Sequence, residues 1–229
     1  MEPACGGKIY RDNKGLAWVN PYKKEVWDYL IEVGKKAGEA GFDEIQFDYI
    51  RFAVDKTMND VVFDDADTQG RNKTQAITEF IGYAHDELAK EGLFVSADVF
   101  GTIMRSEEDA AAVGQEYEDM AEQLDYICPM IYPSHYGPGN FGIEYPDTQP
   151  YDTILNALNG SRELLAASAK EDAPQAVVRP WLQDFTASYL EHYIKYGDEQ
   201  VRQQIQAVYD AGYDQWILWD AGVSYHYGG

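Results

Sequence analysis

The sequence predicts an α/β protein in which parallel strands alternate with helices, and three observations support this fold class. Helix-like and apolar strand-like segments alternate five times along the chain, and no block consists of strands alone. Glycine follows the helical pattern at Gly41, Gly92 and Gly212. Two strand patterns carry an aspartate near their carboxyl ends, Asp48 and Asp98. Such alternation predicts a parallel sheet with helices outside it, and strand-end aspartates indicate the ligand face of an α/β barrel.

Each expected element has a local signal. Pro21 starts the first helix, and Asn72 and Gln75 have capping-box spacing at the start of the second. Ser106 starts the third, and a long loop over 134–149 precedes the fourth. We expect strands over 44–52, 93–101, 126–133, 176–185 and 215–220, with helices over 21–40, 72–91, 106–124 and 151–169 and a last helical stretch that ends near 212.

The five helix–strand units limit the architecture. A closed TIM-type (β/α)8 barrel needs eight units. The sequence therefore predicts either a barrel that is incomplete at its N-terminal side or an open α/β sheet. A length of 229 residues suits a single domain over 1–229.

Composition excludes several classes of function. The chain has 18 Lys and Arg against 40 Asp and Glu, a net charge of -22, which argues against nucleic acid and anionic membrane surfaces and fits a neutral or cationic ligand. Cys5 and Cys128 do not make a disulfide framework. We expect no membrane span and recognise no signal peptide, so an extracellular or cell-surface location would need an export signal upstream.

The two aspartates form a candidate catalytic pair. Side chains alternate along a strand, so Gln46 and Asp48 share one face, as Ser96 and Asp98 do on the next strand. Two carboxylates that flank a bond are what glycoside hydrolysis requires. Neighbouring strands lie about 4.8 Å apart, which is close to the roughly 5 to 5.5 Å carboxyl separation of retaining enzymes.

Other strand-end side chains could bind a sugar. Arg51 could keep Asp48 ionised or contact substrate hydroxyls, although a plain ion pair would also explain it. Tyr and Trp side chains could stack on a sugar or fill the core. The candidate substrate-binding residues are Gln46, Arg51, Tyr132, His135, Trp181, Gln183, Asp184, Trp219 and Asp220.

Several other motifs lack the features that their functions require. Gly137–Gly142 matches the dinucleotide string G-x-G-x-x-G but lacks the strand–turn–helix context. Asn59–Asp67 lacks the ligand spacing of a calcium loop. The four histidines show no metal spacing, which argues against a polysaccharide deacetylase, and we expect no metal and no cofactor.

Six segments of the chain carry a resemblance to a known family, namely 18–22, 44–52, 96–101, 127–136, 179–185 and 216–221. At these segments the chain resembles a bacterial family of glycosyl hydrolase domains of unknown function with a TIM-barrel fold. The resemblance implies a carbohydrate substrate, and it implies that the chain corresponds to the later part of the family domain.

More distant similarity suggests roles for the acids. Residues 41–48 look like the fourth strand of α-amylase-type enzymes, in which Asp48 would match the nucleophile, Asp98 would take the place of the acid and Asp184 that of the third carboxylate. The same segment also looks like the chitinase strand motif, but Ile50 stands where those enzymes have their acid. The alternative function is a non-catalytic carbohydrate-binding or scaffold domain, and the oligomeric state stays open.

Overall fold

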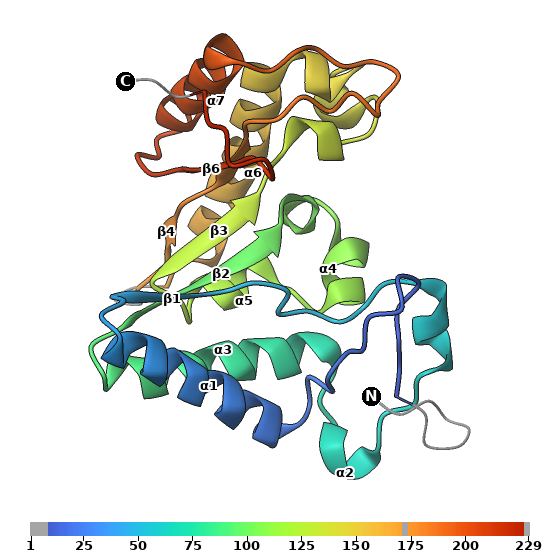
Figure 1. Cartoon of the computed structure of the whole chain (residues 1–229), viewed down its shortest axis with the longest axis vertical. Helices are drawn as coiled ribbons and strands as arrows, with labels where there is room; N and C mark the ends of the chain where they lie inside the picture. The colour runs from blue at the N-terminus through green and yellow to red at the C-terminus, as the bar shows by residue number, and fades with distance from the viewer. Residues whose placement is uncertain (1–8, 171–173, 227–229) are drawn as a thin grey trace.

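A parallel sheet with β1 at one edge and β6 at the other forms the centre of the molecule (Figure 1). The structure is a computed structural model and describes residues 9–170 and 174–226. Its six strands run in the order β1-β2-β3-β5-β6, with β4 also paired to β3, and every pairing is parallel. The strands are β1 Glu44–Phe47, β2 Phe94–Phe100, β3 Tyr126–Met130, β4 Val177–Val178, β5 Trp181–Gln183 and β6 Ile217–Trp219.

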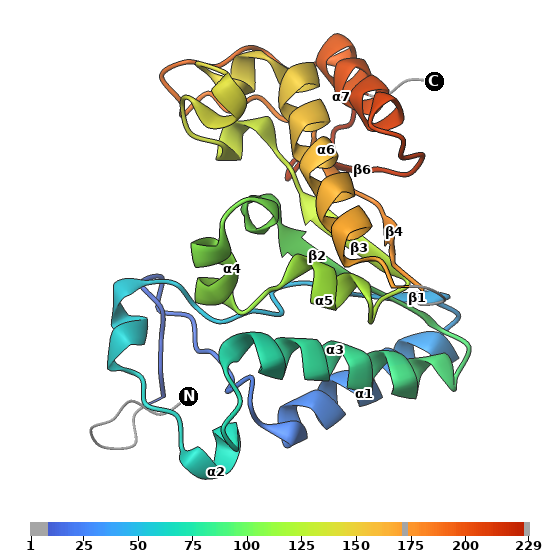
Figure 2. The same cartoon turned by 180° about the vertical axis from the view of Figure 1, so that it is seen from behind.

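The helices lie along the outside of this curled sheet. Helices α1 and α3 lie side by side next to β1 and β2, whereas α6 and α7 pack together at the opposite end (Figures 1 and 2). The helices are α1 Lys24–Glu39, α2 Asp65–Thr68, α3 Lys73–Ala89, α4 Glu107–Val113, α5 Tyr117–Ala121, α6 Pro150–Ser168 and α7 Asp198–Asp210. Short 3-10 segments are η1 Lys56–Asp60, η2 Gly101–Met104, η3 Pro133–His135, η4 Asn140–Gly142 and η5 Pro146–Thr148.

The two faces of the sheet differ in chemistry. On β2, Val95, Ala97 and Val99 are fully buried on the helix-covered face. Ser96 and Asp98 alternate with them and lie on the inner face. Burying such an apolar side chain contributes about 1.5 to 3 kcal/mol. The outer face therefore stabilises the fold, and the inner face is left for polar side chains.

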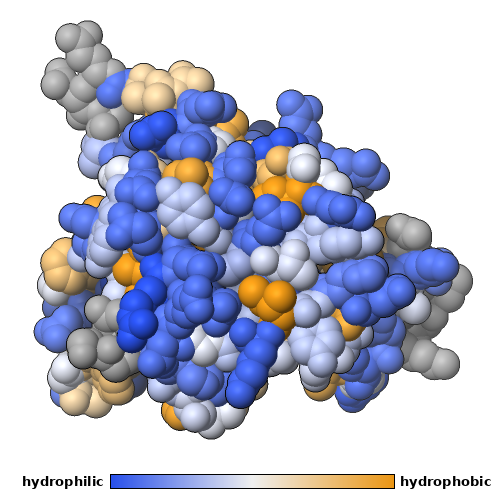
Figure 3. All heavy atoms as spheres, turned by 90° about the horizontal axis from the view of Figure 1, so that it is seen from above, coloured by the Kyte–Doolittle hydropathy of each residue, from blue (hydrophilic) through white to orange (hydrophobic). Residues whose placement is uncertain are grey.

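The face of the molecule above α6 and α7 is mostly polar. Seen from above the α6 and α7 end, hydrophilic residues cover most of the face and apolar residues form small separate groups (Figure 3). The net charge of -22 is thus compatible with an ordinary solvated surface.

The expected strand over 44–52 is wrong in length, because β1 ends at Phe47. Tyr49 has a φ of 57°, in the left-handed region that a non-glycine residue adopts at a cost. The Tyr49 amide donates to Asp48 Oδ1 at 2.7 Å. The chain therefore leaves the sheet at Asp48.

Two other expected elements are each divided by a backbone-specific residue. The strand over 176–185 is split into β4 and β5 around Pro180, which has no N–H for the sheet. The helix over 106–124 is split into α4 and α5 after Gly114, whose φ is 77°. The capping box of Asn72 and Gln75 is confirmed at the start of α3.

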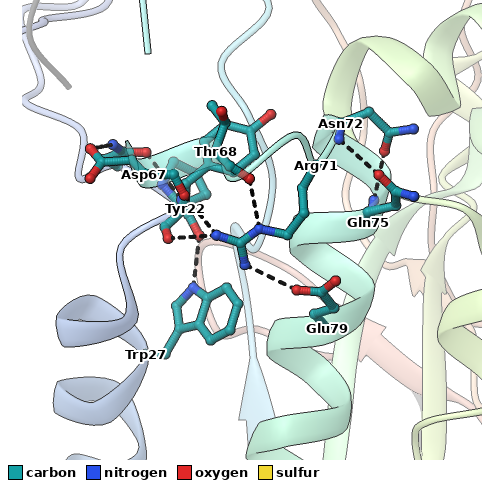
Figure 4. Close-up of polar contacts among 10 residues, drawn as sticks. Tyr22, Trp27, Asp67, Thr68, Arg71, Asn72, Gln75 and Glu79 are labelled. Atoms are coloured by element: carbon teal, nitrogen blue, oxygen red, sulfur yellow. Dashed lines mark hydrogen bonds and ion pairs between the residues drawn. The ribbon is translucent and has the colours of Figure 1, made fainter. Parts of the chain in front are cut away.

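Arg71 fastens the loop that follows β1 to the two neighbouring helices (Figure 4). Its guanidinium donates to the carbonyl of Tyr22 at 3.3 Å and to that of Asp67 at 2.7 Å. It also pairs with Glu79 of α3 at 3.0 Å, and Nε donates to the carbonyl of Thr68 at 2.9 Å. This one side chain therefore joins α2 to α3 and to the segment that precedes α1.

We expect Gly101→Ala to destabilise the protein by about 1 to 3 kcal/mol through overpacking. A Cβ at Gly101 would meet Tyr136 Oη and would lie 2.7 Å from the carbonyl oxygen of Met130. Gly160→Ala in α6 is the matched control, because nothing lies within 4 Å of its added methyl. Urea unfolding should show a loss of stability for the first variant only, and equal effects would contradict this packing.

Candidate active site

Asp98 lies at the centre of the inner face and binds groups from two other strands. Its side chain is only 7% exposed. Oδ1 accepts a hydrogen bond from Gln46 Nε2 of β1 at 2.8 Å and another from Trp181 Nε1 of β5 at 2.7 Å. No described residue donates to Oδ2. Oδ1 is therefore occupied by two hydrogen bonds, whereas Oδ2 is available to a ligand.

Burial raises the pKa of Asp98 to about 7. The hydrogen bond from Trp181 lowers the pKa, the negative charge of Asp48 raises it, and Gln46 and Arg179 oppose the shift. Near neutral pH a substantial fraction of the group is thus protonated. Because Oδ1 already accepts two hydrogen bonds, the proton belongs on Oδ2. A carboxyl group in this state can donate a proton to a ligand.

Asp48 directly follows the last residue of β1, next to the strand that carries Asp98. Phe47 pairs with Ala97 in the β1–β2 register, so each of these two paired residues is followed by an aspartate, although the chain leaves the sheet at Asp48. Asp48 is exposed to solvent. Its negative charge raises the pKa of both Asp98 and Tyr132, which places the three groups within electrostatic reach of one another.

Tyr132 and His135 follow β3 at the same end of the sheet. The Tyr132 ring is buried and lies 5.1 Å from the His135 ring and 5.9 Å from Phe185, measured between centroids. Burial raises the pKa of Tyr132, so its hydroxyl stays protonated. His135 is exposed by surface area, yet its surroundings desolvate the ring enough to lower its pKa.

Gln183 and Asp184 are enclosed and hold loops together. Gln183 is fully buried: Oε1 accepts from the Ser134 amide at 3.0 Å, and Nε2 donates to Asp147 Oδ1 at 2.9 Å. The Asp184 carboxylate accepts from the backbone amide and ring of His226, each at 2.8 Å. In this structure both side chains position the chain around the strand ends.

The last two predicted contacts lie on the exposed side of β6. Trp219 is 43% exposed and meets Trp181 edge to face, with ring centroids 5.9 Å apart. Asp220 is half-buried and accepts a hydrogen bond from the Ser224 amide at 2.9 Å. The Trp219 ring is therefore available to a ligand next to the Trp181–Asp98 hydrogen bond.

Arg51 packs among aromatic rings. Its guanidinium carbon lies 4.9 Å from the Trp18 ring centroid, 5.4 Å from that of Tyr49 and 5.0 Å from that of Phe100. Partial burial lowers its pKa, and the negative charges around it, Asp48 among them, oppose that shift. No ion pair joins Arg51 to a carboxylate of the described chain, so the simple ion-pair explanation does not apply.

Gln115 was not predicted as a site residue, yet it joins β2 to the segment that follows β1. Gln115 is 1% exposed, and its Nε2 donates to the carbonyls of Ile50 and Asp98 at 3.3 and 3.4 Å. Its Oε1 accepts from the Phe100 amide at 3.3 Å. The one available signal was an amide side chain directly after the glycine that ends α4.

A second overlooked group lies one layer below Asp98. Glu44 pairs with Arg179 and accepts from Ser96 Oγ at 2.6 Å. The Arg179 guanidinium lies 4.2 Å from the centroid of the Tyr126 ring. Strand alternation places Glu44 on the same face as Gln46, and this was the signal that could have found it.

In residues 9–170 and 174–226, no group of three or more His, Cys, Asp and Glu side chains could hold a metal ion. No helix there is long and apolar enough to cross a bilayer. Cys128 is buried and unpaired, whereas Cys5 lies outside the described residues.

The chain matches the family described as "Putative glycosyl hydrolase domain" over residues 3–225 and belongs to that family. This confirms the resemblance stated above. No curated protein sequence matches it.

Solved structures share the fold. The glycoside hydrolase domain of PgaB (BpsB) from Bordetella bronchiseptica has a TM-score of 0.61 at 10% identity, covering 96% of this chain and 64% of that one. The spore cortex-lytic enzyme SleL of Bacillus cereus has 0.56 at 13%, covering 96% and 55%. A class V chitinase from Pseudomonas fluorescens Pf-5 has 0.55 at 13%, covering 88% and 69%. The chain spans less than two thirds of the first two. At these identities the likeness shows the fold, and the expected incomplete barrel is confirmed.

We expect the stability of the protein to fall between about pH 4 and pH 8 because of Asp98. The pKa of about 7 in the folded protein exceeds the ordinary aspartate value of 3.8, so the contribution of Asp98 to stability is fully present at low pH and is lost as pH rises through 7. Asp98→Asn, which mimics the protonated form, should gain at most about 4 kcal/mol relative to wild type across this range, at 1.36 kcal/mol per pKa unit.

Denaturant unfolding at pH 5 and pH 8 measures this difference. Asp220→Asn, directly after β6, is the control and should show no such gain. If the free energy of unfolding differed between wild type and Asp98→Asn by the same amount at both pH values, this would contradict a neutral, buried Asp98.

Proposed function

We propose that this domain hydrolyses a glycosidic bond in a polysaccharide, with Asp98 as general acid and Asp48 as nucleophile or base. The observation that carries the proposal is the difference in environment between the two carboxyl groups that follow the paired residues Phe47 and Ala97. Asp98 is buried with a pKa of about 7, and Asp48 is exposed. Glycoside hydrolysis needs one carboxyl that donates a proton and one that attacks or activates water.

The proposed steps use atoms already placed at the strand ends. Asp98 Oδ2 would protonate the glycosidic oxygen while Gln46 and Trp181 hold Oδ1. Asp48 would act on the anomeric carbon, either directly or through water. We propose the retaining course, in which Asp48 is the nucleophile: retaining enzymes hold their two carboxyl groups about 5 to 5.5 Å apart, and the residues before the two aspartates are register partners.

The remaining residues would bind the sugar chain or hold the site. We propose Trp219 as a stacking surface, because it is 43% exposed beside Trp181. Tyr132 and His135 would contact sugar hydroxyls from β3. Gln183 and Asp184 would act as positioning residues, since their side chains are buried in contacts with loops.

A non-catalytic glycan-binding domain is the second candidate function. The observation that favours it is the sheet order, in which β1 and β6 are edges and are not paired with each other. An open sheet gives solvent more access to the inner face than a closed barrel does. Binding of a polysaccharide without release of reducing ends would favour this function.

We expect Asp98→Asn and Asp48→Asn each to lower hydrolysis by roughly 100-fold or more, as the loss of general acid–base catalysis does. Reducing-sugar release from a panel of polysaccharides is the measurement, and far-UV circular dichroism checks folding. Full activity in either variant would refute the role of that residue.

The pH profile gives a second test of Asp98. Activity should decline as pH rises through about 7, because the proton donor is lost. Trp181→Phe removes a hydrogen bond that lowers the pKa of Asp98, so the decline should move to higher pH. Trp219→Phe is the control, since Trp219 touches Trp181 and makes no hydrogen bond to Asp98 in the described structure. A profile that does not move in Trp181→Phe would exclude Asp98 as the titrating acid.

A further inference from the structure

Arg51 is a partly buried cation with available hydrogen-bond donors. Nη1 donates to the carbonyl of Phe52 at 3.0 Å. The other guanidinium N–H groups donate to no residue that the structure describes. Arg71 and Arg179 are half-buried too, but each has a carboxylate partner, Glu79 and Glu44 respectively. A charge that loses water without gaining a partner destabilises a fold, so Arg51 calls for an explanation other than stability.

The rings around Arg51 restrict where a partner can bind. Trp18, Tyr49 and Phe100 come from three separate segments and surround the guanidinium at 4.9 to 5.4 Å. Rings that stack on a planar guanidinium cover its faces and leave the N–H edge available. That edge carries the fork of donors that matches the two oxygens of a carboxylate.

The position of Arg51 places such a ligand in the proposed active site. It lies three residues after Asp48, and the Asp48 charge acts on it. Phe100, one of its three rings, lies two residues after Asp98 on the same face of β2. A group bound at Arg51 would therefore belong to a sugar unit at or next to the bond that is cleaved.

We propose that Arg51 binds a carboxylate carried by a sugar unit of the substrate, so that the preferred substrate is an acidic glycan. This inference rests on the function proposed above. A neutral hydroxyl could accept one hydrogen bond, whereas a carboxylate accepts two from the guanidinium fork and forms a direct ion pair, which no residue of the described chain supplies. The net charge of -22 repels acidic glycans at long range, so recognition depends on this local contact, and binding is best compared at about 0.15 M salt, where the Debye length is about 8 Å.

Isothermal titration calorimetry with matched ligands tests the inference. Tetragalacturonate and its methyl ester differ in the charge of a carboxyl on the sugar ring. A disaccharide that contains N-acetylmuramic acid and its lactyl methyl ester differ in a carboxyl on an ether side chain. All titrations use an Asp98→Asn background, so binding is measured without turnover. The series that shows a preference for the acid identifies the source of the carboxylate.

We expect at least about tenfold tighter binding of the acid than of its ester in one series, as for a charge-assisted hydrogen bond. Arg51→Gln should abolish this preference. Arg51→Lys should retain part of it, because it keeps the charge but loses the fork. Arg105→Gln is the control: Arg105 lies 4.8 Å from the Phe141 ring and lines a separate groove with Gly160 and Glu163 of α6, so the preference should remain.

Any of three binding results would overturn the inference. The first is equal binding of acid and ester in both series, and the second is no binding of any of the four ligands. The third is an unchanged preference for the acid in Arg51→Gln or Arg51→Lys when the thermal stability of the variant is unchanged. Asp98-dependent hydrolysis of a neutral polysaccharide without any acid preference would refute the inference and leave the proposed hydrolase function standing. An acid preference without hydrolysis by the unmodified chain would do the reverse.

Discussion

The carboxyl group of Asp98 is held between Gln46 of β1 and Trp181 of β5, so one buried group joins three strands of the sheet. Both donors bind the same oxygen, which is an arrangement that a protonated carboxyl tolerates and that leaves the second oxygen for a ligand. Burial disfavours the ionised form, and the neighbouring Asp48 charge adds to this effect. The packing that joins the strands is therefore also what keeps a proton available.

Polar groups on the inner face are compensated layer by layer. At the amino ends of the strands, Glu44 and Arg179 neutralise each other. In the middle layer, Asp98 avoids charge by keeping a proton. At the carboxyl ends, Asp48 is exposed and Arg51 has aromatic neighbours instead of an ion partner. Of these charged groups, Asp48 and Arg51 lack an ion-pair partner within the described residues, and both follow the carboxyl end of β1, where a parallel sheet commonly binds its ligands.

Local sequence signals predicted much of the fold. The capping box of Asn72 and Gln75 was correct, because a helix start is decided by residues within one turn. The bounds of the strands were less predictable. Tyr49 adopts a left-handed backbone conformation, which cannot be predicted from a tyrosine in the sequence, so β1 ends earlier than its apolar pattern suggests. Pro180, in contrast, was a visible reason to divide β4 from β5.

The sequence by itself determined the alternation of helices and strands and which side chains share a face of a strand, such as Ser96 and Asp98 of β2, because the face depends on a period of two along each strand. The tertiary structure decided burial and partners. Asp98 meets Gln46 across 52 positions and Trp181 across 83. Asp184 is covered by His226, 42 positions away, so a residue expected to contact a ligand became a structural one. Such contacts depend on how distant segments pack, and no local pattern encodes them.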